Sequence, residues 1–313
     1  MDLTSNRVFL EKCSDYSEHS LADCCNKILT PCVSNRNLRT LQVLLKPNLI
    51  TARMGTLACT EGKFILAVAQ WFLDQGACVS IGDSPAFGTS TSVLQKMGIA
   101  DALRKLSVSI IDFKEVRIVP LPSGISAGIA VDALDCDLLV NIPRVKAHAQ
   151  LRVTLAVKNL FGCMVGMRKP LWHMMHGGKC GDFTHHLVEL LSVLPAGITI
   201  VDGVTAMHRT GPMGGLSFPL GIVACSDNPV AIDRALLSVL RVKPDMSPFM
   251  QTCIKMNLNG TDLDSLVFPL CIPGDLQVNS FEVPKSLNSI RFNPFNFLRG
   301  IARRVLPKLG LSP

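Results

Sequence analysis

The sequence predicts an α/β fold, an open and mostly parallel twisted sheet with helices on both faces, followed by an irregular C-terminal extension. Short apolar runs of strand length alternate with longer segments whose apolar residues recur at helical spacing. Strands separated by helical segments of about ten to fifteen residues are typical of parallel βαβ units. With 313 residues, of which 48% are hydrophobic and 18% charged, the chain can bury a core as one large domain or as two packed lobes.

The alternation begins at residues 41–45, a continuous apolar run of strand length. Residues 61–75 have the length and periodicity of a helix, which Gly76 ends. Residues 78–81 are again an apolar strand segment, and the turn after them leads into a helix at residues 89–97 that is entered through Thr and Ser caps. These segments predict two successive βα units.

Later segments continue the same pattern. Residues 116–121 and 128–131 predict a hairpin or an edge excursion about Pro122 and Gly124. We expect further strands at residues 108–113, 137–142, 198–202 and 220–225, and further helices at residues 183–194 and 229–240.

Composition divides the chain into four parts. We expect an N-terminal helical lead-in at residues 1–38, the α/β domain at residues 39–242, an irregular extension packed on it at residues 243–294, and a basic amphipathic tail at residues 295–313. In the tail, apolar residues fall near one helical face with basic residues around it, which suits either weak contact with a membrane surface or packing on the domain. Both alternatives stay open.

Composition also excludes several classes of protein. No N-terminal secretory signal is visible, and no apolar run reaches the roughly eighteen residues of a spanning helix, so we expect a cytoplasmic protein. The formal net charge of +7 is a mild excess. Because basic residues do not interleave with aromatic ones in a chain with one Tyr and two Trp, we expect no nucleic-acid partner.

The twelve cysteines are scattered through apolar segments, as buried thiols in a reducing compartment usually are. No Cys-x-x-Cys occurs, so the chain carries no 4Fe-4S signature and no zinc signature. The cofactor therefore stays unknown from the sequence, and no metal ligands are assigned.

Polar residues follow four of the predicted strands, at the point where each strand ends. They are Lys46 and Asn48, Asp83 and Ser84, Asn141 with the segment up to His148, and Asp202. Because ligands of open α/β sheets bind beyond the carboxyl ends of the strands, we expect these residues at one edge of the sheet. Two roles stay open for the turn after residue 81. It is an anion-binding loop, or it is a capping turn in which Asp83 hydrogen-bonds to its own turn.

Residues 140–166 carry the clearest functional pattern, because Arg144, Lys146, His148, Lys158 and Asn159 interrupt a mostly apolar sequence. Isolated cations in an apolar setting cost free energy unless an anion or a hydrogen-bonding partner meets them. The pattern therefore predicts a pocket for a negatively charged ligand. A lysine in such a pocket has a lowered pKa, which makes it a candidate base or Schiff-base nucleophile as well as an anion ligand.

Each candidate also has a structural alternative. Lys158 acts on the ligand, or it extends to solvent or pairs with Asp202. His148 is a general acid or base, or it is a structural histidine. Asp202 anchors the loop after its strand, or it pairs with the site lysines.

A second group of histidines lies in the glycine-rich residues 166–186, together with Lys169. Glycines around bulky apolar residues are typical of a lid that closes over a substrate. His173 and its neighbours suit metal binding in principle, but the segment lacks the His-Glu-x-x-His arrangement of zinc hydrolases, so we predict no tight catalytic metal.

Together these motifs resemble those of the domain-of-unknown-function 362 family. In order along the chain they are KPN at residues 46–48, GDSP at 82–85, NIPRVKAH at 141–148, TLAVKNLFG at 154–162, then Lys169 and His173, VDGVTAM at 201–207, GPMGG at 211–215 and DNPVAID at 227–233. The resemblance covers residues 40–240. It implies a prokaryotic, cytoplasmic α/β domain of undetermined reaction, associated with ferredoxin-type 4Fe-4S modules. The C-terminal part holds only Cys253 and Cys271, so such a module is missing from this chain.

Two hypotheses from different classes follow. In the first, the chain is an enzyme, acid–base or redox-linked, that binds a small carboxylate or phosphate metabolite. Its catalytic residues are Lys158, His148, Asp202 and His173, and its ligand-binding residues are Lys46, Asn48, Asp83, Ser84, Asn141, Arg144, Lys146, Asn159 and Lys169. In the second, the chain is a non-catalytic accessory protein whose cations dock a ferredoxin-type iron–sulfur partner. A concave pocket favours the enzyme, and a flat basic rim favours docking.

Overall fold

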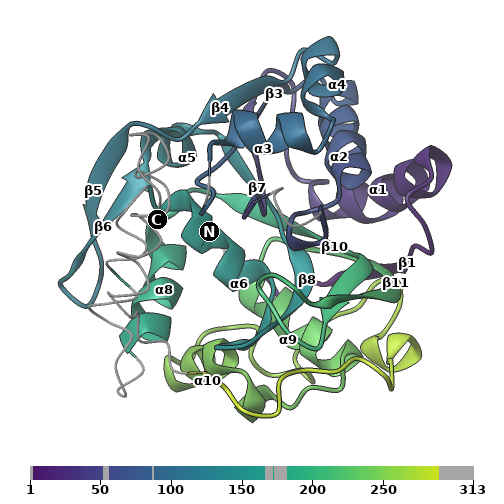
Figure 1. The fold of residues 1–313 in the computed structure, drawn as a ribbon, viewed down its shortest axis with the longest axis vertical. Coiled ribbons are helices and arrows are strands. Elements are labelled where there is room, and N and C mark those ends of the chain that lie inside the picture. The colour runs from purple at the N-terminus through teal and green to yellow at the C-terminus, as the bar shows by residue number, and fades with distance from the viewer. Residues whose placement is uncertain (1–2, 52–55, 87, 166–171, 173–181, 289–313) are drawn as a thin grey trace, which may run out of the picture.

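The computed structural model describes residues 3–51, 56–86, 88–165, 172 and 182–288. Its centre is a twisted sheet in the order β1-β11-β10-β7-β2-β3-β4, with β8 paired to β10 and β9 paired to β8 (Figure 1). The strands are β1 (Phe9–Lys12), β2 (Gln42–Pro47), β3 (Cys78–Asp83), β4 (Ser109–Asp112), β7 (Leu138–Ile142), β8 (Arg144–His148), β9 (Arg152–Thr154), β10 (Gly197–His208) and β11 (Leu216–Ser226). The run from β10 to β4 is parallel throughout, which confirms the predicted fold class.

Helices cover both faces of the sheet, and a separate cluster of apolar residues is buried on each face. The helices are α1 (Glu18–Cys32), α2 (Gly62–Asp74), α3 (Ser90–Lys96), α4 (Ala100–Lys105), α5 (Val131–Asp135), α6 (Ala156–Asn159), α8 (Asp182–Val193), α9 (Pro229–Val239) and α10 (Pro248–Lys255). The short 3-10 helices are η1 (Thr56–Ala58), η2 (Leu160–Cys163), η3 (Pro244–Met246) and η4 (Pro273–Leu276). α1, α2 and α4 pack on one face, while α6, α8, α9 and α10 pack on the other.

The predicted hairpin forms a separate two-stranded antiparallel sheet of β5 (Val116–Pro120) and β6 (Ser126–Ala130), at the left of Figure 1. The predicted helix after β3 starts from Thr89, whose hydroxyl accepts a hydrogen bond from the Ser92 backbone N–H in a capping box. Local capping and periodicity therefore located these elements correctly.

Three strands were not predicted. The N-terminal lead-in contains β1 as well as helix α1, and β1 pairs antiparallel with β11 at the sheet edge. Its four residues, FLEK, are too few to show a period, and their partner lies about 200 residues away. β8 and β9 occupy residues that we expected to follow the strand at residues 137–142 as a polar segment lining a pocket, whereas the alternating buried residues of β8 form a strand of their own.

The C-terminal extension contains helix α10 and contributes to the core. Leu266, Leu276 and Phe281 are buried against the cluster that α9 covers. The backbone of Val267 exchanges hydrogen bonds with Asn6 and Val8 near the start of the chain. The C-terminal extension is thus joined to the N-terminal segment by backbone hydrogen bonds.

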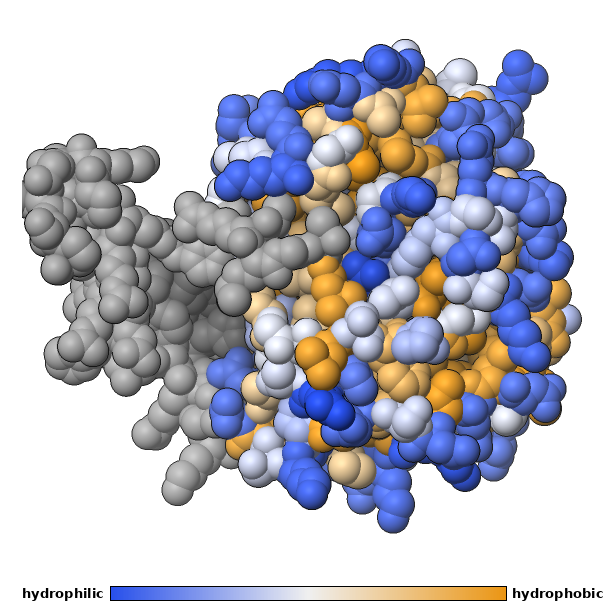
Figure 2. All heavy atoms as spheres, turned by 45° about the vertical axis from the view of Figure 1, so that its right-hand side comes forward, coloured by the Kyte–Doolittle hydropathy of each residue, from blue (hydrophilic) through white to orange (hydrophobic). Residues whose placement is uncertain are grey.

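The face in Figure 2 is hydrophilic along its outline, with apolar residues reaching the surface between the polar ones. Among the described residues, none of the helices combines the length and apolar character needed to cross a membrane. The predicted tail at residues 295–313 lies outside the described residues, as does most of the predicted lid.

Candidate functional site

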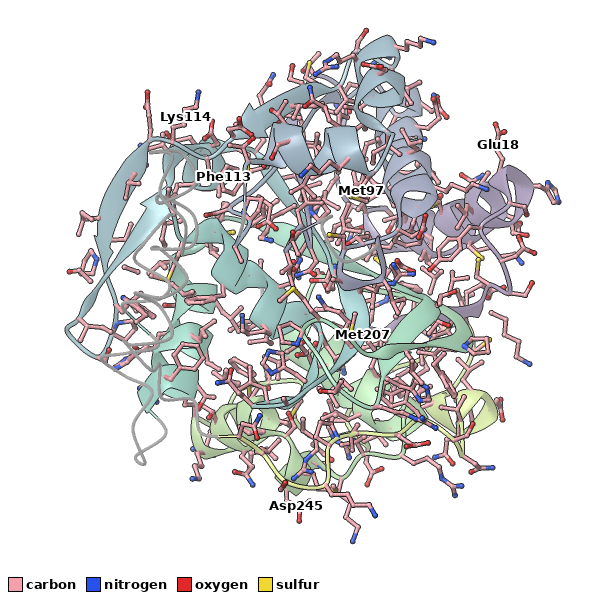
Figure 3. The ribbon with its side chains drawn as sticks, in the orientation of Figure 1. Glu18, Met97, Phe113, Lys114, Met207 and Asp245 are labelled. Carbon is pink, nitrogen blue, oxygen red and sulfur yellow. The ribbon has the colours of Figure 1, made fainter. Side chains whose placement is uncertain are left out.

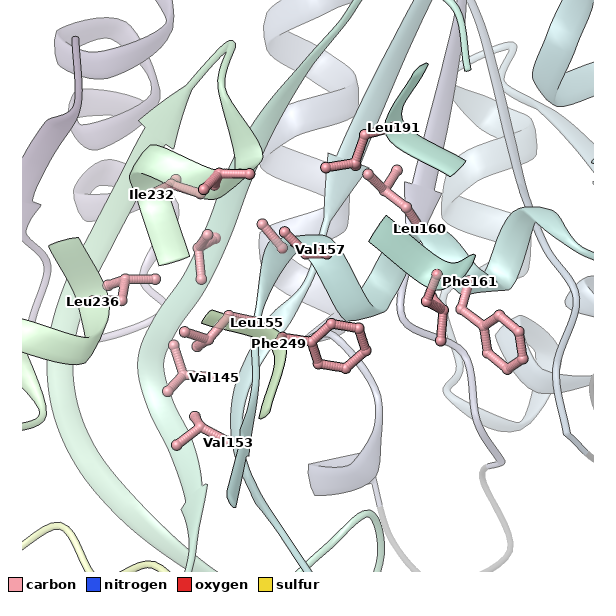
Figure 4. Close-up of a cluster of buried hydrophobic side chains, with 14 of the residues drawn as sticks. Val145, Val153, Leu155, Val157, Leu160, Phe161, Leu191, Ile232, Leu236 and Phe249 are labelled. Atoms are coloured by element: carbon pink, nitrogen blue, oxygen red, sulfur yellow. The ribbon is translucent and has the colours of Figure 1, made fainter. Parts of the chain in front are cut away.

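The basic residues of β8 share one face of the strand. Arg144, Lys146 and His148 alternate with Val145 and Ala147, and side chains two apart in a strand point the same way. Val145 points into the apolar cluster of Figure 4, and the register pairs Lys146 with Met207 of β10, labelled in Figure 3. The basic side chains are nevertheless only 2%, 2% and 7% exposed. Each must therefore find partners inside the protein.

Arg144 is neutralised by Asp202. Its Nε lies 3.6 Å from the Asp202 carboxylate and donates to the Thr205 carbonyl at 2.7 Å, while Nη1 donates to the Cys59 carbonyl at 2.9 Å. Burial raises the pKa of Asp202, and the charge of Arg144 acts in the opposite direction. Asp202 therefore pairs with an arginine of the site, not with Lys158 or another lysine.

Tyr16 completes this pair and was not predicted. Its hydroxyl donates to Asp202 Oδ1 at 2.7 Å and accepts from Arg144 Nη2 and from the Thr205 N–H, each at 3.0 Å. Burial and the charge of Asp202 raise the pKa of Tyr16. Tyr16 immediately precedes Ser17, which caps α1. Nothing local in the sequence marks it, because its contacts lie more than 100 positions away.

A second ion pair joins Lys46 at the end of β2 to Asp83 at the end of β3. The Nζ–Oδ1 distance is 2.8 Å, and the two side chains are 0% and 5% exposed. Asp83 also accepts the backbone N–H groups of Leu49 and Ser84, both at 2.8 Å. Asp83 thus bonds its own turn, as one of the two predicted roles requires, and also holds β2 to β3.

Gly162 of η2 lies directly against this ion pair. A Cβ at position 162 would overlap Asp83 Oδ1 and Lys46 Nζ. The glycine therefore permits a close approach of backbone to charge that a side chain would prevent.

A chain of amide groups links Lys146 to the sheet. The Lys146 ammonium donates to Asn48 Oδ1, Asn48 donates to Asn159 Oδ1 at 2.9 Å, and Asn159 donates to Asn141 Oδ1 at 2.8 Å. Asn141 in turn donates to the Ala156 carbonyl at 3.0 Å. Each amide accepts a hydrogen bond from the group before it and donates one to the group after it, so the chain of bonds fixes the orientation of each amide.

Lys146 differs from the other two buried cations in the charge of its partners. Its ammonium donates to the Asn48 carbonyl and, at 2.9 Å, to the Ala58 carbonyl, and both acceptors are neutral. Burial lowers the pKa of Lys146 from 10.5 to about 7; Cys59 and Asp83 act against this shift, and the positive charges of Arg144 and Lys46 act with it. Near neutral pH this lysine can therefore give up or take a proton.

His148 and Lys158 lie at the margin of these networks. His148 Nδ1 accepts the Gln150 N–H at 3.2 Å, which leaves the proton of a neutral ring on Nε2. The Lys158 ammonium lies 4.5 Å from the centre of the Phe161 ring, a cation–π contact. Lys158 is half-buried, whereas the β8 residues are buried.

Helix α6, which carries Lys158 and Asn159, is fixed by Asp233 of α9. The Asp233 carboxylate accepts the N–H groups of Ala156 at 2.7 Å and of Val157 at 3.3 Å. Burial raises the pKa of Asp233 to about 7. The apolar side chains of α6 and α9 also pack together in the cluster of Figure 4.

Of the predicted site residues, most converge. Lys46, Asn48, Asp83, Asn141, Lys146 and Asn159 share one bonded network, which the hydrogen bond from Asn159 to the Lys46 carbonyl joins to the ion pair, and Ser84 contributes its backbone N–H. Arg144 and Asp202 form a second network, joined to the first through the adjacent carbonyls of Ala58 and Cys59. His173 and Lys169 lie outside the described residues. Within the described part of the chain, no three His, Cys, Asp or Glu side chains are placed to hold a metal ion.

Comparison with known proteins gives one family and one close relative. The family model described as "Domain of unknown function (DUF362)" matches residues 43–238. A thylakoid-associated protein of Synechocystis sp. is 35% identical over 260 residues, which cover 82% of this chain and 81% of the relative.

Two solved structures align more weakly. They are the lactate racemase apoprotein from Thermoanaerobacterium thermosaccharolyticum, at 14% identity, and a structural-genomics target from Thermotoga maritima, at 11% identity. Each has a TM-score of 0.42 and covers 64% of this chain, while the chain spans only 52% and 53% of their lengths. Similarity at this level indicates nothing about the reaction.

Proposed function

Because the chain belongs to the DUF362 family, a family described without a reaction, we propose a function from the site itself. We propose that the protein is an enzyme that binds a small carboxylate or phosphate metabolite at the carboxyl edge of the sheet. Lys146 exchanges a proton with this ligand. The proposal rests on the lowered pKa of Lys146, whose bonding partners are neutral.

The charges around Lys146 support a proton-exchanging role. Lys46 and Arg144 already have the carboxylates of Asp83 and Asp202 beside them, so their role is to position the groups around Lys146. An anion beside Lys146 favours the ammonium form, because opposite charges a few ångströms apart attract strongly away from bulk water. Ligand binding is therefore accompanied by proton uptake on Lys146.

Two half-buried side chains of the candidate site suit the binding of the anion. Asn48 holds Lys146 on one side and remains half-buried, and Lys158 supplies a second cation from α6. We assign Asn48 and Lys158 to ligand binding, with Asp202 and Tyr16 holding Arg144 in place. His148 serves as a second acid–base group at the far end of β8.

Docking of an iron–sulfur partner gains little support from these cations. Lys46, Arg144 and Lys146 are at most 2% exposed, so they cannot complement an acidic surface on another protein. We place the protein in the cytoplasm with weak membrane-surface contact through residues 295–313. The thylakoid association of the Synechocystis relative supports that contact, and sedimentation of the full chain with anionic vesicles tests it.

Ligand-dependent thermal stabilisation tests the enzyme proposal. A panel of phosphates, carboxylates and divalent metals is screened against wild type and Lys146→Met, with Lys96→Met as the matched control because Lys96 is exposed on α3. A ligand at 100 times its Kd stabilises the native state by about 2.7 kcal/mol. We expect an anion to raise the melting temperature of wild type and of the control, but not of Lys146→Met.

Calorimetry in buffers of different ionisation enthalpy then measures proton uptake for the anion found. Uptake near pH 7 that disappears in Lys146→Met supports the proposal. An anion that stabilises Lys146→Met as much as wild type, or the failure of every anion to stabilise wild type, contradicts it.

A further inference from the structure

A groove outside the candidate site runs along the outer side of α2. Helix α2 packs between α1 and α4, at the upper right of Figure 1, and these three helices form the walls of the groove. We call it the α2 groove, and its volume is about 640 Å³. Pockets that bind small molecules commonly have volumes of about 300–1,000 Å³. The α2 groove is therefore large enough for a small-molecule ligand.

The floor of the α2 groove is apolar. It is formed by Leu21 and Cys25 of α1, Leu66 and Ala67 of α2, and Leu106 at the end of α4. Leu66, Ala67 and Leu106 are only half-buried, so apolar surface remains accessible between the helices. Contiguous apolar surface in a hollow is typical of ligand-binding grooves. The α2 groove therefore suits the apolar part of a ligand.

Two contacts fix the direction of the α2 groove. The Tyr16 hydroxyl and the Glu61 backbone N–H donate to the Asp202 carboxylate, at 2.7 and 2.9 Å, so α1 and α2 start side by side. Further along both helices, the Trp71 indole N–H donates to Asn26 Oδ1 at 2.9 Å. The groove thus extends from Tyr16 along α2 to Trp71. Because α2 has 13 residues, it is about 20 Å long, which suits an extended acyl chain.

A second hollow, of about 530 Å³, adjoins the α2 groove. Trp71 and Asp74 line both, so the two are neighbours. Arg36 and Arg39 also line the second hollow, which we call the arginine hollow, and Asp74 is the one acid among its described lining residues. Within the described part of the chain, no carboxylate lies within 4.0 Å of either guanidinium group. Two arginines are thus left to meet an anion from outside.

The excess of positive charge lies at this one end. Along the α2 groove itself, Lys63 and Lys105 are matched in number by Glu18 and Asp74. Arginine side chains bind carboxylates and phosphates through paired N–H donors. A ligand that complements both hollows therefore has an apolar chain and, at one end, an anionic group.

We propose that the α2 groove and the arginine hollow together bind an amphiphile with one acyl chain and an anionic head group. The head group lies against Arg36 and Arg39, and the chain lies along α2 over Leu66 and Ala67. A free fatty acid and a lysophospholipid share this chemistry. This binding site is separate from the site of Lys146 and does not depend on the function proposed for it.

Isothermal titration of the full chain tests the proposal. The probes are dodecanoate and dodecyl phosphate, each below its micelle concentration. Binding of either probe supports the proposal, and the tighter one identifies the head group. Decanoate is two methylene groups shorter than dodecanoate, so we expect it to bind about tenfold more weakly if the chain lies in an apolar groove.

Two tryptophan substitutions on α1 test the position of the chain. Ala22 is exposed and lines the α2 groove, so Ala22→Trp places an indole ring in the path of the chain. His19 is exposed on the same helix but is not among the lining residues, so His19→Trp is the matched control. We expect Ala22→Trp to weaken the binding of dodecanoate by about tenfold or more, and His19→Trp to bind it like wild type.

Arginine substitutions test the position of the head group. We expect Arg36→Gln combined with Arg39→Gln to weaken binding by about tenfold, because charge-assisted hydrogen bonds are lost. Arg104 is exposed on α4 and lines neither hollow, so Arg104→Gln is the matched control and should bind like wild type.

Three outcomes overturn the proposal. The first is that neither amphiphile binds wild type, and the second is that Ala22→Trp binds dodecanoate as tightly as wild type does. The third is binding that Lys146→Met abolishes but Ala22→Trp retains, since the amphiphile then occupies the candidate site on β8 and not the α2 groove.

Discussion

At the scale of single residues, the site depends on how each buried cation is neutralised. Lys46 lies against Asp83 and Arg144 against Asp202, so their charges are matched. Lys146 is held by two neutral carbonyl groups, and its charged form has no matched acid. A buried charge without a counter-ion favours the neutral form, which is why burial lowers the pKa of Lys146 to about 7.

This difference predicts a pH dependence of stability. Lys146 has a pKa of about 7 in the folded protein, against 10.5 in its ordinary state. Between these values the unfolded chain binds more protons, so the free energy of unfolding rises with pH by about 1.4 kcal/mol per unit. Below pH 7 both states carry the proton, and the full cost of the buried charge remains.

Urea denaturation of wild type and Lys146→Met across this range measures the effect. We expect the free energy of unfolding of wild type, minus that of the variant, to increase as pH rises from 7 to about 10. Lys96→Met, the exposed control, should run parallel to wild type. Parallel curves for Lys146→Met as well would mean that Lys146 keeps its ordinary pKa.

Many site residues could be found from the sequence, because the strand-end rule needs only local patterns. Lys46, Asp83 and Asn141 each follow or end an apolar run, and parallel strands bring such positions to one edge. Tyr16 could not be found, since no periodicity or motif marks it. The carbonyls of Ala58 and Cys59 could not either, because any residue type offers a backbone acceptor.

At the scale of elements, the sequence predicted those strands and helices that have a clear period of their own. β2, β3, β7 and the hairpin β5–β6 lie where apolar runs placed them. β8 has a strict alternation too, but its charges indicated a ligand pocket beyond the end of a strand, and not a further strand of the sheet. Only the buried acids and amides brought by other elements make that face an interior one.

The short 3-10 helix η2 yields the second prediction, since Gly162 lies against the Lys46–Asp83 ion pair. Gly162→Ala inserts a methyl group where Asp83 Oδ1 and Lys46 Nζ now lie, and the pair must move. Overpacking of this kind costs about 1–3 kcal/mol. We expect a loss of that size in the free energy of unfolding by urea denaturation.

Gly274→Ala is the matched control for this substitution. At position 274 the nearest neighbouring atom lies 4.0 Å from an added Cβ, so the methyl group fits in open space. Equal stability of both variants would show that η2 can shift away from the ion pair at no cost.

At the scale of the whole molecule, segments far apart in sequence complete the α/β domain. The family model begins at residue 43, yet Tyr16 and β1 precede it, and β1 covers the edge of β11. After residue 238, α10 and the extension add buried residues such as Leu266 and Phe281 to the core. The predicted boundaries at residues 39 and 242 separate patterns in the sequence, whereas the core runs across both.

The third prediction follows from this continuity. A chain of residues 39–242 leaves the β11 edge unpaired and uncovers the sheet face on which Leu21, Ile28 and Leu29 of α1 pack. It also leaves the buried Asp202 and Arg144 without Tyr16. We expect this chain to lack a cooperative thermal transition by circular dichroism and to bind the dye ANS, as loosely packed states do. A chain of residues 1–288, which keeps every described element, should melt cooperatively like the full chain. If residues 39–242 melt as sharply and at the same temperature as residues 1–288, the domain is self-sufficient, and the N-terminal strand, α1 and Tyr16 are additions to a site that stands without them.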